Sequence, residues 1–149
     1  MSEWAPHVTV ATVIERDGRF LLVEERAGSE AVFNQPAGHL EAGESLEDAA
    51  RRETLEETGY RVQLDGILGL ALYTSPANGV TYHRTTFYGT ALPGKPAAEL
   101  DTDIIAAHWL TMTEIRAHSD RMRSPLVIAS IEQYLAGQRW PLDVIYNKQ

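Results

Sequence analysis

The sequence predicts an α/β (α+β) fold, a sandwich in which a mixed central sheet is flanked by helices. Three features of the 149-residue chain predict it: strand-like runs rich in valine and threonine, one clearly patterned helix near residue 50, and glycine or proline turns between the elements. Strands and helices mixed in this way are typical of a sheet that lies between helices. The 44% of hydrophobic residues suffice for one sizeable core, so we expect a single domain over residues 1–149.

The N-terminal part of the chain is predicted to form a hairpin. His7 to Glu15 and Arg19 to Glu25 are strand-like runs on either side of an Asp17-Gly18 turn. A loop is expected from Arg26 to about Asn34, followed by the turn-forming run Gln35-Pro36-Ala37-Gly38.

The clearest element is a helix from Leu46 to Thr58. Ser45 stands where an N-cap residue is wanted, and Asp48 completes a short variant of the capping box. Gly59 follows the last helical residue, where a left-handed conformation commonly ends a helix. Both ends of this helix are therefore marked in the sequence.

The rest of the chain alternates between the two kinds of element. Strands are expected at Arg61 to Thr74 with a break at Gly66, at Tyr82 to Leu92 and at Ile104 to Leu110, and helices at Thr113 to His118 and at Pro125 to Leu135. The tail from Gly137 to Gln149 shows no clear preference.

The composition argues against several classes of protein. There is no cysteine, so the chain has neither disulfides nor thiolate metal sites. The first residues lack the basic start and apolar run of a secretion signal, and no stretch is long enough to span a membrane. The net charge of -8 disfavours a nucleic-acid partner. We expect a cytoplasmic protein, a monomer or homodimer, that acts on a small molecule.

Three glutamates gather on one side of the predicted helix. Glu53, Glu56 and Glu57 stand at positions i, i+3 and i+4, so their carboxylates can reach one point in space. Their mutual repulsion is unfavourable unless cations lie among them, and carboxylate oxygens suit Mg²⁺ or Mn²⁺. The alternative is a solvated acidic face, which surface helices often carry. The surroundings favour the metal, because Gly38 lies in the loop upstream and Arg52 can orient a carboxylate.

The segment from Gly38 to Tyr60 resembles a known motif. It reads GHLEAGESLEDAARRETLEETGY and resembles the Nudix box, G-x5-E-x7-R-E-U-x-E-E-x-G-U, in which U is apolar. The two U positions hold Thr54 and Tyr60, which fit more loosely. The seven fixed positions are matched by Gly38, Glu44, Arg52, Glu53, Glu56, Glu57 and Gly59. The resemblance implies the Nudix fold and a hydrolase that cleaves phosphoanhydride bonds.

The resemblance also implies roles for the box residues. Glu53, Glu56 and Glu57 would hold one to three Mg²⁺ ions, or Mn²⁺ in their place, with help from the Gly38 carbonyl. Arg52 would pair with a box glutamate and fix the ligands. The catalytic residues are accordingly expected to be Glu53, Arg52 and Glu57.

The general base has two candidate locations, the box helix and a later loop. Glu53 ranks first. In this family the base can also come from a loop after the later strands, where Glu99, Asp101 and Asp103 stand here, and Asp101 or Asp103 is the alternative candidate. Ordinary surface acidity is the competing explanation for that loop.

Similarity beyond the box indicates a substrate class. PHVTVA, NQPAGHLE and the RSPLV segment are similar to a bacterial branch of the family. This implies activity on nucleoside triphosphates and diphosphates, and on hydroxymethylpyrimidine diphosphate, a thiamin-pathway intermediate, with release of orthophosphate.

Candidate substrate contacts are the side chains of Phe33, Gln35, His39 and Tyr73. Phe33 stands where tryptophan is expected, and a structural hydrogen bond is an equal explanation for His39. Arg26 and Arg84 are further candidates for phosphate contacts, although an ordinary surface arginine is the commoner explanation for each.

Two other functions fit the same motif. One is a pyrophosphatase of nucleoside diphosphates linked to another moiety, which releases a nucleoside monophosphate. The other is a non-catalytic nucleotide-binding module, whose mark would be the loss of box carboxylates, and all of them are present.

Overall fold

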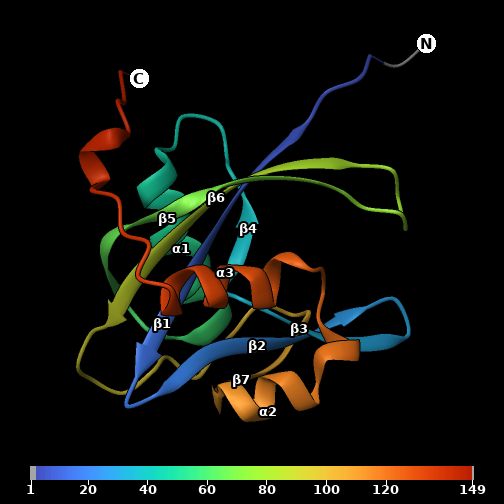
Figure 1. Ribbon diagram of the computed structural model, residues 1–149, viewed down its shortest axis with the longest axis vertical. Coiled ribbons are helices and arrows are strands. Elements are labelled where there is room, and N and C mark those ends of the chain that lie inside the picture. The colour runs from blue at the N-terminus through green and yellow to red at the C-terminus, as the bar shows by residue number, and fades with distance from the viewer. Residues whose placement is uncertain (1–2, 149) are drawn as a thin grey trace.

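The fold is a seven-stranded mixed sheet that lies between helices (Figure 1). The computed structural model describes residues 3–148; Met1, Ser2 and Gln149, which the predicted domain includes, lie outside this range. Helix α1 (Leu46–Thr58) packs on one face of the sheet and α3 (Leu126–Leu135) on the other, so the predicted sandwich is confirmed. No helix between Glu3 and Lys148 has the length and apolar character needed to cross a membrane.

The strands are joined in an order that differs from their order in the chain. They are β1 (His7–Arg16), β2 (Arg19–Ala27), β3 (Glu30–Asn34), β4 (Ala37–His39), β5 (Val62–Thr74), β6 (Thr81–Ala91) and β7 (Ile104–Thr111). The helices besides α1 and α3 are α2 (Met112–Ala117) and the 3-10 turns η1 (Ser119–Arg121) and η2 (Leu142–Val144). The sheet order is β3-β2-β1-β6-β5, with β4 paired to β1 and β7 to β2. Only β1 and β6 run parallel among these pairs, which makes the sheet mixed.

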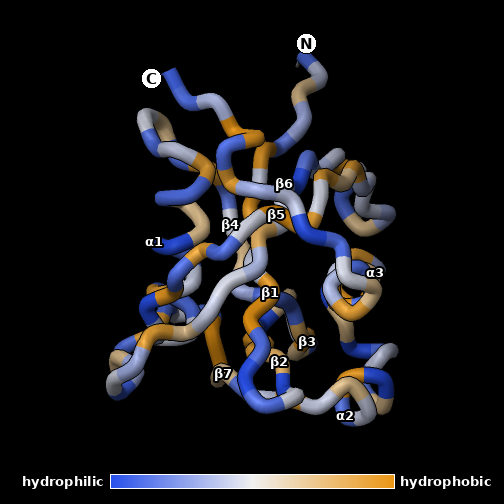
Figure 2. Tube along the Cα trace, turned by 60° about the vertical axis from the view of Figure 1, so that its left-hand side comes forward, coloured by the Kyte–Doolittle hydropathy of each residue, from blue (hydrophilic) through white to orange (hydrophobic). Residues whose placement is uncertain are grey.

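The core forms two layers because side chains alternate along each strand. Val10 of β1 packs with Ala49 and Ala50 of α1, whereas Val13 faces the other way and packs with Val127 of α3. Each of these five side chains is at most 1% exposed. Figure 2 shows the corresponding hydrophobic stretch along β1 and a hydrophilic C-terminal end.

Strand β4 sets the position of the box loop. β1 pairs with β2 only beside the Asp17-Gly18 turn and then diverges from it, so that β4 becomes its neighbour. In β4, Gly38 lies opposite Val10 and His39 lies opposite Thr9. Because neighbours in a strand point to opposite faces, Gly38 belongs to the α1 face and His39 to the α3 face.

Two predictions about strands were wrong. The expected loop up to Asn34 contains β3, which returns along β2 through a tight turn where Gly28 has a φ of 64°. The expected break at Gly66 is absent, because β5 is one strand whose register shifts beside Gly66 and Gly69. A Cβ at residue 66 would lie 2.6 Å from the carbonyl oxygen of Trp140, which pairs with the edge of β5, so glycine allows this close approach.

Candidate active site

Helix α1 presents the three glutamates of the box, and its bounds are those predicted from the sequence. Ser45 Oγ accepts a hydrogen bond from the backbone N–H of Asp48 at 3.1 Å. Gly59 ends the helix at a φ of 78°. Thr54, a loose fit in the motif, is buried and donates its hydroxyl hydrogen to a carbonyl one turn back, which satisfies its polar group. The helix is therefore fixed at both ends and along its inner face.

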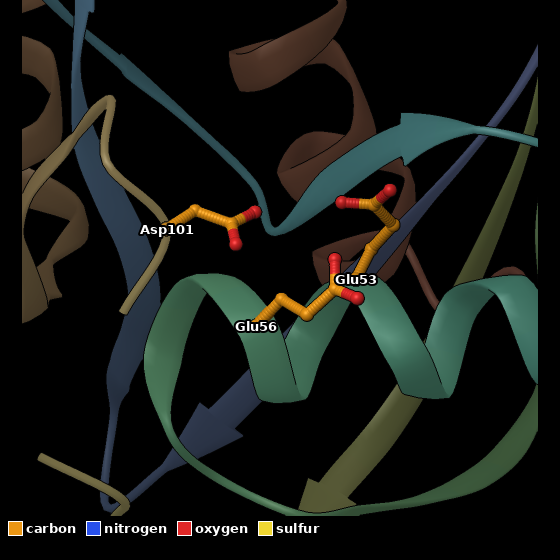
Figure 3. Close-up of side chains that lie close together, drawn as sticks. All are labelled: Glu53, Glu56 and Asp101. Atoms are coloured by element: carbon orange, nitrogen blue, oxygen red, sulfur yellow. The ribbon is translucent and has the colours of Figure 1, made fainter. Parts of the chain in front are cut away.

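Carboxylates from α1 and from the loop before β7 meet at the centre of the site (Figure 3). Glu53, Glu56 and Asp101 each offer an oxygen, and these oxygens all lie within 4.8 Å of one another. Asp101 is held there because its backbone N–H donates to the Glu56 carbonyl at 3.0 Å. The sequence named Asp101 only as an alternative base, whereas the structure brings it into the cluster. Asp103, its companion in that prediction, is not one of these three residues.

Glu57 lies inward of the cluster and is 8% exposed. Its carboxylate accepts the backbone N–H of Ala37 at 2.8 Å, which ties α1 to β4. Burial, with smaller contributions from the Glu25, Glu53 and Asp101 carboxylates, raises the pKa of Glu57 to about 9. A carboxylate that is costly to ionise without a cation is one that a bound cation stabilises.

Glu53 packs against the backbone of β4. A Cβ at residue 38 would collide with the Glu53 carboxyl group, so this close approach requires Gly38. Burial raises the pKa of Glu53, while its hydrogen bond to Arg52 opposes the rise. Two residues that the motif assigns to the same site thus lie in contact.

Arg52 holds these carboxylates in place. Its Nε and Nη2 donate to the two oxygens of Glu44 at 2.7 and 2.9 Å, a bidentate pair that fixes the plane of the guanidinium. Nη1 donates to Glu53 at 2.7 Å and to Glu56 at 3.3 Å, and Nη2 also donates to the His39 carbonyl at 3.1 Å. The hydrogen bond to Glu44 contributes most to a raised pKa of Arg52, and the same bond lowers the pKa of Glu44. One guanidinium thus joins the box loop to two carboxylates of the cluster.

The donor set fits a divalent cation. All three cluster ligands are carboxylate oxygens, which Mg²⁺ prefers. Two oxygens bound to one ion at about 2.1–2.5 Å lie at most about 4–5 Å apart, and the cluster meets that condition. Arg52 alone does not balance the negative charge of Glu44, Glu53, Glu56 and Asp101.

Two predicted substrate contacts are engaged inside the protein instead. Phe33 is 5% exposed, and the guanidinium of Arg121 lies 4.8 Å from its ring centroid. Gln35 is 1% exposed; its Nε2 donates to the Val127 carbonyl, and its Oε1 accepts from Arg84, both at 2.7 Å. Both side chains are buried and bonded within the protein, so substrate contact by Phe33 and Gln35 stays a prediction that this arrangement disfavours.

The other two predicted contacts lie on a more open face. His39 is exposed, and its Nε2 lies 3.0 Å from Nδ1 of His7. The rings of His7, His39 and Tyr82 touch edge to face, and Tyr73 lies opposite Tyr82 on the neighbouring strand. Substrate contact by His39 and Tyr73 stays a prediction.

Sequence reasoning missed Glu25. This residue of β2 is largely buried, pairs with Arg123 at 3.0 Å and contributes to the raised pKa of Glu57. Burial raises the pKa of Glu25 as well. No motif marks it; the one signal is a charged residue near the end of a strand.

Comparison with known proteins identifies the family. The NUDIX domain pattern matches residues 4–130. The chain belongs to the Nudix family. As a Nudix hydrolase it is a phosphohydrolase that acts on a small phosphate compound. It is 42% identical over 140 residues to Phosphatase NudJ of Escherichia coli (strain K12), which covers 94% of this chain and 90% of that protein. Phosphatase NudJ of Shigella flexneri is equally similar, with the same coverage of both chains.

Solved structures agree with this assignment. A NUDIX hydrolase from Nitrosomonas europaea superposes with a TM-score of 0.94 at 47% identity, over 97% of this Nudix chain and 98% of that chain. MutT NUDIX hydrolase from Burkholderia pseudomallei has a TM-score of 0.69 at 26% identity, over 87% and 98% of the two chains. The predicted Nudix fold is confirmed.

Proposed function

We propose that this Nudix hydrolase uses Mg²⁺, with Mn²⁺ as a substitute, to cleave phosphoanhydride bonds with release of orthophosphate. Its substrates would be nucleoside triphosphates and diphosphates and related small pyrophosphates such as hydroxymethylpyrimidine diphosphate. The observation that carries the proposal is the close cluster of Glu53, Glu56 and Asp101, oriented by Arg52. Similarity to Phosphatase NudJ supports orthophosphate as the product.

The box carboxylates would hold the cation. Glu53, Glu56 and Asp101 would supply hard oxygen ligands, and the neighbouring Glu57 carboxylate and the Gly38 carbonyl would be further donors. When bound, the cation supplies Lewis-acid chemistry, since it offsets the charge of the phosphate oxygens that would otherwise be repelled. The acidic site thus takes an anionic substrate through a cation.

Glu53 is the proposed general base. Burial raises its pKa, which favours proton uptake, and its bond to Arg52 orients the carboxylate. It would take the proton of the water that attacks phosphorus, while the P–O bond to the leaving phosphate breaks and its electron pair departs with that oxygen. Asp101 is the second candidate, because it is exposed and lies in the same cluster.

Product identification tests the proposal. Purified protein is incubated with Mg²⁺ and a panel of nucleoside triphosphates, nucleoside diphosphates, hydroxymethylpyrimidine diphosphate and nucleoside diphosphate conjugates, with a parallel series in EDTA. We expect orthophosphate release that stops in EDTA. Release of a nucleoside monophosphate with a phosphorylated fragment would instead support the linked-diphosphate pyrophosphatase. Binding of nucleotides without any product would support the non-catalytic module.

A further inference from the structure

Arg84 of β6 is a buried cation for which residues 3–148 provide no carboxylate partner. It is 5% exposed, so it is not the surface arginine that the sequence favoured. Among residues 3–148, none of the ion pairs includes it. Burial alone lowers its pKa, to about 10, so the guanidinium is charged at neutral pH. A buried charge is unfavourable unless it is paired, so this residue calls for an explanation.

The contacts of Arg84 within the protein are neutral and few. Its Nη2 donates to Oε1 of Gln35 at 2.7 Å, and Nε2 of Gln35 in turn donates to the Val127 carbonyl. Its Nε is buried and has no hydrogen-bond partner within the described part of the chain. A guanidinium has five N–H donors, and one amide oxygen leaves most of them unused. These bonds hold the side chain in position but do not balance its charge.

The position of Arg84 in the sheet separates it from the carboxylate cluster. Arg84 is the β6 partner of Thr9, and His39 is the β4 partner of the same residue. Partners in a sheet share a face, so Arg84 and His39 both belong to the α3 face, whereas Gly38 and Glu53 meet on the α1 face. Tyr82, two residues before Arg84, lies on the same α3 face and touches the His39 ring.

We propose that Arg84 is the base of an anion-binding subsite on the α3 face of the sheet, beside His39 and Tyr82, and that its ligand is a phosphate or carboxylate group. An oxyanion supplies both the missing charge and acceptors for the unused N–H donors, which the planar guanidinium fork suits. Such a group has two sources: the end of a substrate remote from the reacting phosphates, or free phosphate.

Phosphate binding by the metal-free protein tests the subsite. In EDTA the carboxylate cluster repels phosphate, so any phosphate binding that is measured occurs at another site. We expect saturable binding of inorganic phosphate, measured by calorimetry, that Arg84→Met weakens at least about tenfold. Arg19→Met is the matched control, because Arg19 is an exposed strand arginine, and it should leave the affinity unchanged. Equal affinity in Arg84→Met, or no binding by the wild type, would overturn the proposal.

Melting temperature separates a binding role from a bracing role. Replacement of a buried unpaired charge by an apolar side chain is often neutral or stabilising. Lost phosphate binding with an unchanged or raised melting temperature therefore supports the subsite, and a lowered melting temperature with binding intact contradicts it. Arg84→Lys covers the case in which the methionine variant does not fold. It keeps the charge but loses the fork, so we expect about two- to tenfold weaker binding, and unchanged affinity would contradict the proposal.

Steady-state hydrolysis identifies the source of the anion. A raised KM at constant kcat in Arg84→Met shows that the subsite receives the substrate. An unchanged KM with weaker inhibition by added phosphate shows that it receives free phosphate. The calorimetric experiment needs no turnover, so the subsite and the proposed hydrolysis fail independently.

Discussion

The two faces of β4 handle charge in opposite ways. On the α1 face, Arg52 forms ion pairs with four glutamates, and negative charge remains in excess. On the α3 face, Arg84 meets one neutral amide. The pKa of the guanidinium is therefore raised in Arg52 and lowered in Arg84. The difference teaches that Arg52 is a positioning residue whose charge the protein itself pairs, whereas the charge of Arg84 meets no carboxylate among the described residues.

Removal of one carboxylate on the α1 face should cause the largest loss of activity. Glu57→Gln keeps an oxygen for the Ala37 N–H but loses the charge, so the fold survives while the cation is held weakly. Since a metal ion stabilises the transition state by several kcal/mol, we expect kcat to fall on the order of 10³-fold. Phosphate release with saturating substrate measures it. A variant that keeps more than a tenth of wild-type activity would show that Glu57 is not a cation ligand.

Loss of the arginine that orders the cluster should be the next largest effect. In Arg52→Gln the Glu44, Glu53 and Glu56 carboxylates lose their common partner, so we expect activity to fall about 10–100-fold with weaker Mg²⁺ affinity. Arg51→Gln is the matched control, because the neighbouring arginine pairs with exposed Asp48 and, among residues 3–148, with none of the cluster carboxylates. Equal losses in the two variants would remove Arg52 from the site.

The loop before β7 offers a smaller test. Asp101→Asn removes one cluster carboxylate, and we expect about a tenfold loss of kcat/KM. Asp103→Asn changes a residue of the same loop outside the cluster and should alter it less than about twofold. If Asp103→Asn proved the more harmful change, the second place for the general base would move to that residue.

The stability of the metal-free protein should depend on pH through the same carboxyl groups. The pKa of Glu57 rises from 4.5 to about 9 on folding, so its contribution is fully present below pH 4.5 and is lost as pH rises towards 9. The pKa shifts of Glu25 and Glu53 have the same direction. In EDTA we expect the free energy of unfolding to fall by at least about 1 kcal/mol between pH 5 and 9, measured by urea denaturation.

Two additions sharpen that experiment. Glu57→Gln should flatten the pH dependence, and Mg²⁺ should restore stability at pH 9 because a cation replaces the proton. A metal-free protein that gains stability as pH rises would contradict the assignment of these groups.

Sequence reasoning found the parts of the site that are local in the chain. The bounds of α1 and the side shared by Glu53 and Glu56 follow from caps and helical spacing, which depend on neighbouring residues. Asp101 ranked low because a backbone hydrogen bond to the Glu56 carbonyl brings it to the helix, and no sequence pattern records such a bond.

The directions of strand and loop side chains could not be predicted from the sequence. Phe33 and Gln35 flank the box loop, but nearness in the chain does not tell which way a side chain points, and both turn inward. Arg84 looked like a surface arginine because a charged residue is rarely buried. It is covered because its side chain stands on the α3 face of the central strand β6, where Gln35 connects it to Val127 of α3.

The most direct measurement is a titration of Mn²⁺ into the wild type and Glu57→Gln, with bound ion followed by electron paramagnetic resonance and phosphate release followed in the same samples. We predict that turnover rises with occupancy in the wild type, disappears in EDTA, and is lost together with tight binding in the variant. Turnover without a divalent cation, or full occupancy in the variant, would contradict the account.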